Sequence, residues 1–309
     1  YATNFIFTGL AVAVAFHAAL FNIGAEGQAY LGGLGVALVA LALDPYLPFL
    51  LILPLAILGA AAFGGLWGAI PGWLQAYRGA HIVITTIMFN FIAAAVMTYL
   101  LVNVLIEPGQ ATPETRDFAA NATLPKVHEI AAALGLPAYR SPLNLAFVIA
   151  LLACVLVWLL LWKTRFGYAL RVTGQSHDAA VYAGIDPRRV VVLAMALSGA
   201  LAGCMALNEI MGSQERLLLG FTGGFGFVGI AVALMGRNHP VGIVMAAVLF
   251  GALYQGGSEL AFDMPTISRD MVVVIQGLVI LFAGALENMF RPGLARLFAP
   301  TSTTRAEVR

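Results

Sequence analysis

The amino-acid sequence predicts an all-α polytopic membrane protein with about eight to ten transmembrane helices, some of them broken or half helices. The first observation is composition, because 61% of the 309 residues are hydrophobic and 10% are charged, whereas soluble domains average about 25% charged residues. The second is a mean hydropathy of +0.91. The third is a series of apolar runs, most of them long enough to cross a bilayer once. A single transmembrane domain over 1–309 accounts for all three.

The apolar runs follow one another along the chain and are separated by clusters of Gly, Pro and charged residues. They cover 5–21, 29–43, 49–72, 82–106, 142–162, 189–211, 225–236, 240–257 and 270–287. The run at 225–236 is too short to cross about 30 Å as a helix that rises about 1.5 Å per residue. The run at 29–43 is marginal. We expect these two runs to form broken or half helices.

The Lys and Arg residues predict the orientation, because cytoplasmic loops of membrane proteins carry an excess of them. The loop 163–189 and the tail 288–309 are rich in Lys and Arg and are expected in the cytoplasm. The loop 107–141 mixes acidic and basic residues with several prolines and is expected outside. Alternation of the spans then puts Tyr1 outside, so we expect a further span upstream of it. The formal net charge of +1 leaves no basic face for nucleic acid.

The stretch FNIGAEGQ, residues 21–28, places Asn22, Glu26 and Gln28 between apolar runs. A charged side chain at membrane depth normally faces the interior of a bundle or a wet cavity. Gly24 and Gly27 let the backbone leave helical geometry, which predicts a helix break buried in the bundle. Alternatively, Glu26 lies solvated at a cytoplasmic helix end and favours the positive N-terminus of the next helix.

A second Gly-rich break, GFTGGFGFVGIAVALMG at 220–236, places Phe221, Gly223, Gly224 and Gly226 before the short apolar run. F-x-x-G begins both FNIG and FTGG, which is compatible with paired half helices in two repeats. Asn90 lies in another apolar run, where it forms hydrogen bonds between helices or lines a pathway.

The loop segment TGQSHDAAVYAGI begins at Thr173 and predicts a short amphipathic helix over 176–182, with Gly174 before it and Gly184 as its stop. Such a helix docks into a groove of a partner, or it is a surface helix without one. Cys154 and Cys204 are isolated, His17 and His81 lie at the edges of apolar runs, and His177 and His239 have no carboxylate or His at ligand spacing. We therefore expect no metal or cofactor in this chain. No GxSxG, HExxH or Walker lysine motif is present, so an enzymatic function is not expected.

Four blocks in order carry a resemblance: ALFNIGAEGQ, FGYALRVTGQSHDAAVYAGI, GGFGFVGIAVALMGRNHPVG and VIQGLVILF. They resemble the permease subunits of bacterial ABC importers, in the family that serves branched-chain amino acids, ribose-like sugars and nucleosides. FNIGAEGQ and GRNHP look most like the simple-sugar and nucleoside members. The resemblance covers nearly the whole chain.

The resemblance implies a permease that moves a nucleoside or simple sugar by alternating access. It implies that 174–184, within the coupling loop 163–189, docks on a cytoplasmic ATPase. The docking residues would be Gly174, Gln175, Ser176, Ala179, Ala180 and Gly184. The translocation pathway would include Asn22, Glu26, Gln28, Asn90, Phe221, Gly223, Gly224 and Gly226.

The resemblance also implies the partners and the location. ATP and Mg²⁺ would bind in the separate ATPase subunit, and an extracytoplasmic substrate-binding protein would deliver the solute. A second permease subunit completes the pathway, with a heterodimer favoured over a homodimer. The chain would lie in the lipid bilayer of the bacterial cytoplasmic (inner) membrane. The alternative is an ion-coupled secondary transporter of a small polar solute, but such carriers use intramembrane acidic or His relays, and Glu26 is the one acidic candidate identified inside the bundle.

Overall fold

The computed structural model describes residues 1–133, 135, 140–264, 271, 273–275, 277–279 and 281–282. The chain divides into two compact units, Tyr1–Ala252 and Leu253–Arg309. The predicted tail 288–309 and much of the apolar run 270–287 lie outside the described residues.

The regular elements of the described residues are helices. Their bounds are α1 (Ala2–His17), α2 (Ala25–Leu43), α3 (Phe49–Arg78), α4 (Ile82–Asn103), the 3₁₀ turn η1 (Ala120–Ala122), α5 (Val127–Ala133), α6 (Ala146–Lys163), α7 (Arg165–Gln175), α8 (His177–Tyr182), α9 (Pro187–Ala206), the π-helix η2 (Leu207–Gln214), α10 (Phe225–Met235) and α11 (Pro240–Asp263).

Six helices in the described part of the chain are long and apolar enough to cross a membrane: α2, α3, α4, α6, α9 with its π-helical extension, and α11. The helices α1 and α10 are shorter and apolar. The prediction of an all-α polytopic membrane protein is therefore confirmed. The short run at 225–236 forms the 11-residue α10, as predicted. The run at 29–43 is not a half helix, because AEGQ joins it and α2 reaches 19 residues.

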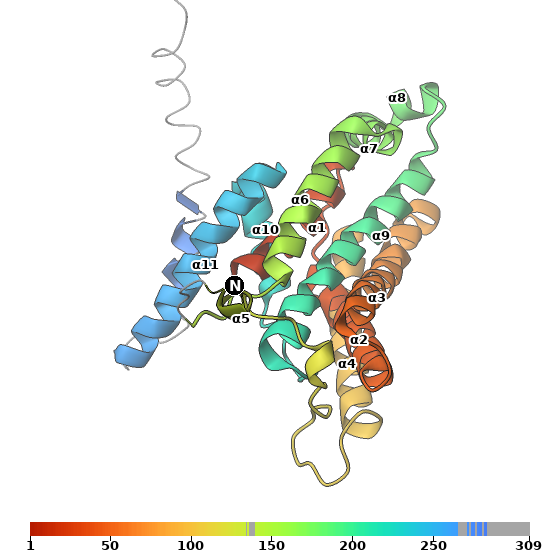
Figure 1. The fold of residues 1–309 in the computed structure, drawn as a ribbon. Helices are drawn as coiled ribbons and strands as arrows, with labels where there is room; N and C mark the ends of the chain where they lie inside the picture. Colours follow the sequence, from red (N-terminus) through yellow and green to blue (C-terminus); the bar gives the residue numbers. More distant parts are fainter. Residues whose placement is uncertain are drawn as a thin grey trace, which may run out of the picture. The chain divides into compact units, whose positions relative to one another are not determined.

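Small residues set the close packing of α3 against α9, which lie side by side (Figure 1). On α3, Gly64 and Gly68 recur every four residues, and on α9 Gly199 and Gly203 do the same. A Cβ at Gly199 would collide with the Gly64 carbonyl oxygen, and a Cβ at Gly64 would collide with that of Gly199. Lipid offers hydrocarbon contacts as good as those of Leu, so helices in membranes associate where backbones approach closely.

The helix α9 continues into the π-helix η2 instead of ending in a loop. The apolar run predicted over 189–211 therefore continues as a helix to Gln214. Short π-helical segments are rare and frequently occur at functional sites. Here the segment carries Asn208 and Glu209 toward the first turn of α1, where both side chains contact Asn4.

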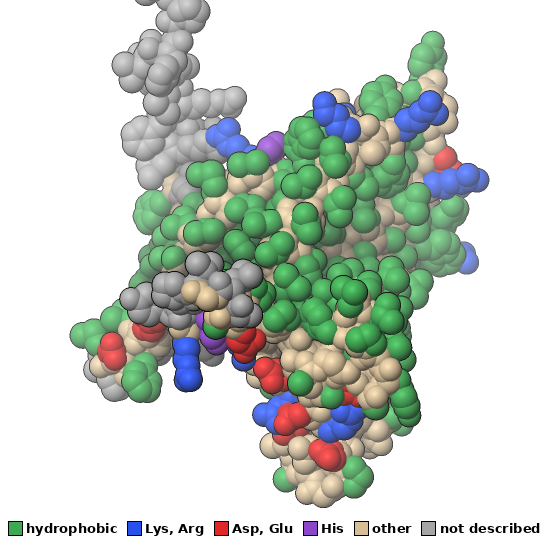
Figure 2. Space-filling model, viewed as in Figure 1, with side chains coloured by type: hydrophobic (Ala, Val, Ile, Leu, Met, Phe, Trp, Pro, Cys, Tyr) green, Lys and Arg blue, Asp and Glu red, His purple; other side chains and the backbone are tan. Residues whose placement is uncertain are grey.

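The two loops predicted to face opposite sides lie at opposite ends of unit Tyr1–Ala252 (Figure 1). One end carries α7 and α8, and the other carries the connection after α4. On the face of this unit drawn in Figure 2, hydrophobic side chains form the middle, and charged side chains gather at both ends. This distribution is typical of a protein that spans a bilayer. Which end is cytoplasmic stays a prediction.

Ion pairs attach the connection after α4 to the rest of its unit. Arg116 forms a bidentate pair with Asp44, the residue that follows α2, with both N···O distances at 2.8 Å. Residues after the π-helix hold the same connection, because Lys126 pairs with Glu215 at 3.3 Å and Arg216 pairs with Asp117 at 3.2 Å. The predicted external loop is therefore joined to α2 and to η2.

Candidate functional site: a buried polar network beside a cavity

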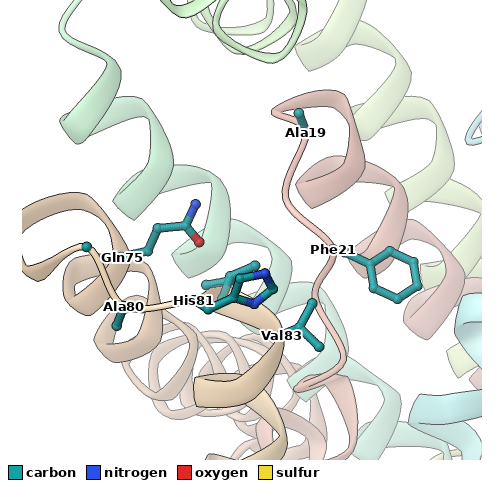
Figure 3. Close-up of a pocket in the computed structure, with 8 residues that line it drawn as sticks. Ala19, Phe21, Gln75, Ala80, His81 and Val83 are labelled. Carbon is teal, nitrogen blue, oxygen red and sulfur yellow. The ribbon is translucent and has the colours of Figure 1, made fainter.

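The linker between α1 and α2, residues 18–24, is the helix break that FNIGAEGQ predicts. The helix α1 ends at His17, and Ala19 adopts a left-handed φ of 56°, which ends the helical path. The helix α2 begins at Ala25. Figure 3 shows the linker passing from Ala19 to Phe21 opposite the turn between α3 and α4.

Asn22 is fully buried, and both atoms of its amide are used inside the protein. Its Oδ1 accepts hydrogen bonds from the Gly24 amide at 2.8 Å and from Gln28 Nε2 at 3.3 Å. Its Nδ2 donates to Gln28 Oε1 at 2.9 Å and to Ser198 Oγ at 2.8 Å. Ser198 in turn donates to the Ala11 carbonyl at 2.6 Å. The network therefore joins the linker to α2, α9 and α1.

Glu26 connects the two Gly-rich breaks directly. Its side chain is buried, and its two carboxylate oxygens accept hydrogen bonds from the amides of Gly224 at 3.0 Å and Gly226 at 2.8 Å. These amides belong to the first turn of α10, where backbone N–H groups lack helical partners and the helix dipole is positive. The burial of Glu26 agrees with a break inside the bundle and contradicts the alternative of a solvated Glu26 at a helix end. Glu26 does stabilise a helix N-terminus, but it is that of the distant α10.

The Gly-rich segment before α10 has the geometry needed for this contact. Gly223 and Gly224 have left-handed φ values of 54° and 80°, which turn the chain into α10. A Cβ at Gly226 would lie 2.6 Å from the Glu26 Cα, so only glycine fits there. Phe221 packs with its ring edge-on to Tyr30, at 5.5 Å between ring centroids.

Asn90 of α4 forms hydrogen bonds with the backbone where the linker enters α2. Its Oδ1 accepts a hydrogen bond from the Gly27 amide at 2.8 Å, and its Nδ2 donates to the Ile23 carbonyl at 2.9 Å. Both partners are backbone groups that the irregular chain would otherwise leave unpaired in the bundle. Of the two alternatives for Asn90, the contacts favour helix-to-helix hydrogen bonding.

A cavity of about 540 Å³ lies between the linker and the α3–α4 turn. Figure 3 shows it, and its lining residues are Ala19, Phe21, Gln75, Gly79, Ala80, His81, Ile82 and Val83. None of these eight is Asp, Glu, Lys or Arg. The Gln75 Oε1 atom is buried and has no hydrogen-bond partner among the described residues. The volume falls within the range of small-molecule sites. Sequence reasoning missed Gln75, because a Gln near a helix end gives no distinctive signal.

The predicted helix in the loop 163–189 is α8. Ser176 caps it by accepting a hydrogen bond from the Ala179 amide at 3.3 Å. Gly184, with a φ of 74°, follows its end. Gly174 does not precede this helix as a separate boundary, because it lies in the last turn of α7. A Cβ there would collide with the His17 carbonyl oxygen.

The exposed residues of α8 are not all the residues that the sequence predicted for docking. Ala179 is exposed, but Ala180 is fully buried and faces the protein. Val181 and Tyr182 are 56% and 96% exposed. Sequence reasoning did not select these two residues, although apolar side chains in a charged loop signal a docking surface.

Sequence analysis also missed Glu209. It lies within the apolar run 189–211, and an acidic residue in such a run is by default a candidate functional residue. Glu209 Oε1 accepts a hydrogen bond from Asn4 Nδ2 at 2.6 Å. Asn208 Nδ2 donates to Asn4 Oδ1 at 2.9 Å, and Asn144 Nδ2 donates to Asn208 Oδ1 at 2.9 Å. The prediction that Glu26 is the one acidic candidate inside the bundle was therefore wrong, because Glu209 is a second one.

Comparisons with known proteins agree with this membrane architecture. A family model described as branched-chain amino acid transport system / permease component matches residues 1–284. The chain is 39% identical over 284 residues to the guanosine ABC transporter permease protein NupP of Bacillus subtilis (strain 168), covering 92% of this chain and 78% of that protein.

Two further relatives are similar over most of their length. The glucose ABC transporter permease protein TsgB13 of Haloferax volcanii is 35% identical over 299 residues, covering 95% of this chain and 77% of that protein. The nucleoside ABC transporter permease protein NupB of Lactococcus lactis subsp. cremoris (strain MG1363) is 35% identical over 283 residues, covering 90% and 75%. No solved structure gives a significant match. This chain belongs to the permease family of the branched-chain amino acid transport systems and is a multi-pass protein of the cytoplasmic membrane.

Proposed function

We propose that this chain is the transmembrane permease subunit of an ATP-driven importer for a nucleoside or simple sugar. The relatives named for guanosine, nucleosides and glucose support this substrate class. The cavity agrees with it, because its lining offers an amide and an imidazole but no charged side chain. A zwitterionic amino acid would leave both of its charges unpaired there.

The observation that carries the proposal is a continuous contact from α7 to the cavity. Gly174 of α7 packs against the backbone of His17, Ala18 and Ala19. Ala19 and Phe21 of the same linker line the cavity. A displacement of α7 and α8 at the cytoplasmic end would therefore move one wall of this cavity.

The mechanism follows from these contacts. A cytoplasmic ATPase, which holds ATP and Mg²⁺, docks on α8 and shifts α7 during its cycle. An external binding protein delivers the solute at the opposite end, and a second permease subunit, in a heterodimer, completes the pathway. Glu26 keeps the two breaks together. Asn22, Gln28 and Asn90 hold the end of the linker next to α2 while its first residues move. The chain itself carries out no hydrolysis.

Two substitutions on α8 test the docking. Tyr182→Ala removes an exposed ring, and Ala179→Glu adds a charge beside it. We expect either change to weaken copurification of the ATPase and to lower ATP-dependent uptake at least about ten-fold, because a central aromatic residue dominates many interfaces. Tyr46→Ala is the matched control for copurification of the ATPase, because Tyr46 is 80% exposed but belongs to the connection between α2 and α3 and not to α8.

Uptake of guanosine and glucose is measured in proteoliposomes that contain the complete complex. Normal ATPase binding and uptake by both α8 variants would contradict the docking. Uptake that proceeds without ATP and stops when a protonophore collapses the ion gradient would instead favour the ion-coupled transporter. In that case Glu209 and Glu26 become the residues to titrate.

A further inference from the structure

We infer that the cavity between the linker 18–24 and the α3–α4 turn is a solute-binding chamber in which the Gln75 amide hydrogen-bonds an uncharged nucleoside or sugar. This inference rests on the proposed function and assigns it a recognition residue. Gln75 belongs to the last turn of α3, close to Gly79, where the helix ends.

The Gln75 side chain carries a hydrogen-bonding atom that the described residues do not satisfy. Its Oε1 is buried but accepts no hydrogen bond from the described residues. The buried amides of Asn22, Gln28 and Asn90 have partners. Other described residues also have a buried side-chain atom without a partner, but none of them lines this cavity: Gln110, Thr173, Arg216, Thr222 and Asn238. A buried polar atom without a partner is destabilising, which makes it a candidate for a ligand contact. In Figure 3 the Gln75 amide and the His81 ring lie on the same side of the linker, and the Phe21 ring extends to the other side.

The lining of the cavity combines hydrogen-bonding and apolar side chains. Gln75 offers both an acceptor and donors, and the His81 ring offers a further hydrogen-bonding nitrogen. Ala19, Ile82 and Val83 add apolar surface. This combination suits a solute that has hydroxyl or base edges and an apolar face. It disfavours leucine or valine in zwitterionic form, because no charged side chain is available to pair with either end.

The linker connects the cavity to α7. The wall opposite Gln75 is the linker, whose first residues pack against Gly174. Movement of α7 would therefore change the distance between the linker and Gln75. The chamber can then hold the solute in one state and release it in another.

The test uses the complete complex of permease, ATPase and binding protein in proteoliposomes. Gln75→Leu replaces the polar amide with branched methyl groups and so removes both the donor and the acceptor. We expect it to lower kcat/KM for uptake about ten-fold, since one lost contact of this kind to a buried group has that order of effect. Asn103→Leu is the matched control, because the Asn103 amide is exposed and bonds to the Tyr99 carbonyl of its own helix at 2.9 Å.

A second measurement does not depend on transport. In a background where Cys154 and Cys204 are replaced by alanine, Ala80→Cys places a thiol in the chamber. Its labelling by a small methanethiosulfonate is followed in inside-out vesicles. We expect guanosine or glucose to slow labelling several-fold and leucine to have no effect.

The possible results distinguish a failure of the chamber hypothesis from a failure of the proposed function. If the wild type transports solute, equal kinetics of Gln75→Leu and Asn103→Leu together with unprotected Cys labelling would overturn the chamber alone. If the wild type transports neither solute, protection by guanosine or glucose would keep the chamber and reject only the transport function. Absence of both transport and protection would overturn both.

Discussion

Single residues in the membrane part of this chain satisfy one another's hydrogen bonds across helices. Asn22, Gln28 and Ser198 form a connected set, and Asn90 serves two backbone groups of the break. In a bilayer an irregular backbone survives only where the protein itself or a wet cavity satisfies it. These side chains therefore make the broken geometry of the linker stable.

The hydrogen bonds of Glu26 predict how a single substitution changes stability and uptake. Glu26→Ala leaves the amides of Gly224 and Gly226 without their acceptors, so we expect a loss of about 2–3 kcal/mol in stability. Uptake should fall as well, while membrane insertion stays intact. Thermal unfolding in mild detergent and solute uptake measure the two effects.

Two variants complete the Glu26 experiment. Glu26→Gln keeps one carbonyl acceptor and should lose less stability than Glu26→Ala. Glu107→Ala changes an exposed carboxylate and should leave the melting temperature unchanged. Equal melting temperatures for Glu26→Ala and the wild type would show that the two hydrogen bonds contribute nothing.

Helices in this protein are positioned mainly by close backbone contact. The carbonyl oxygens of Gly64 and Gly199 occupy the space that side chains would need on the facing helix. The helix α10 depends on a similar approach, because Gly226 lies against the backbone of Glu26. Glycines on α3, α9 and α10 are therefore packing positions.

Gly199→Leu tests the contact between α3 and α9. We expect a loss of at least about 3 kcal/mol, because the added side chain has to separate two backbones. The measurement is the yield of monodisperse protein in detergent, followed by its melting temperature. Ala62→Leu adds a similar volume to an exposed position of α3 and should be tolerated. A stable, monodisperse Gly199→Leu protein would contradict the packing role.

Over the whole of unit Tyr1–Ala252, contacts distant in sequence connect the two ends. Asp44 and Arg116 attach the connection after α4 to α2, and Glu215 and Arg216 attach it to the end of η2. At the other end, Gly174 lies against the end of α1. The helix α1 also contacts η2 through Asn4. It therefore has contacts with segments at both ends.

The Asp44–Arg116 pair predicts a pH dependence. The hydrogen bonds from the Arg116 guanidinium hold the pKa of Asp44 below its usual value. A lowered carboxyl pKa stabilises the folded state above the unfolded value of about 3.9, and this stabilisation is lost as the pH falls through the lower folded value. We expect residues 107–126 to resist proteolysis or hydrogen exchange at pH 5–7 and to lose protection below about pH 4.

Asp44→Asn separates this contact from general acid unfolding. The variant should expose 107–126 to exchange already at pH 7, and it should lack the transition near the Asp44 pKa. Protection in α3 and α9 reports the rest of the unit and should not change at pH 7. Identical exchange of 107–126 in both proteins would show that other contacts hold the connection.

Sequence reasoning identified both Gly-rich breaks, the short α10 and the small helix α8, because each depends on local chemistry. It did not find that Glu26 binds the N-terminus of α10, since these partners are about 200 residues apart in sequence. It missed Gln75 and Tyr182, because the buried amide oxygen of Gln75 and the exposed ring of Tyr182 are recognised only in the folded structure. It overlooked Glu209, although the residue lies in an apolar run.

By itself, the sequence determined the membrane class, most of the spans and the resemblance to a permease family. Hydropathy, glycine placement and ordered motifs are properties of the chain and need no partner to be recognised. The tertiary structure decided which polar groups are already satisfied, and it placed Gln75, whose buried Oε1 has no partner among the described residues, in the lining of a cavity. It also decided that α7 contacts the cavity wall. Hydrogen bonding and close packing are pairwise and distance-dependent, so they become visible only when distant segments are brought together.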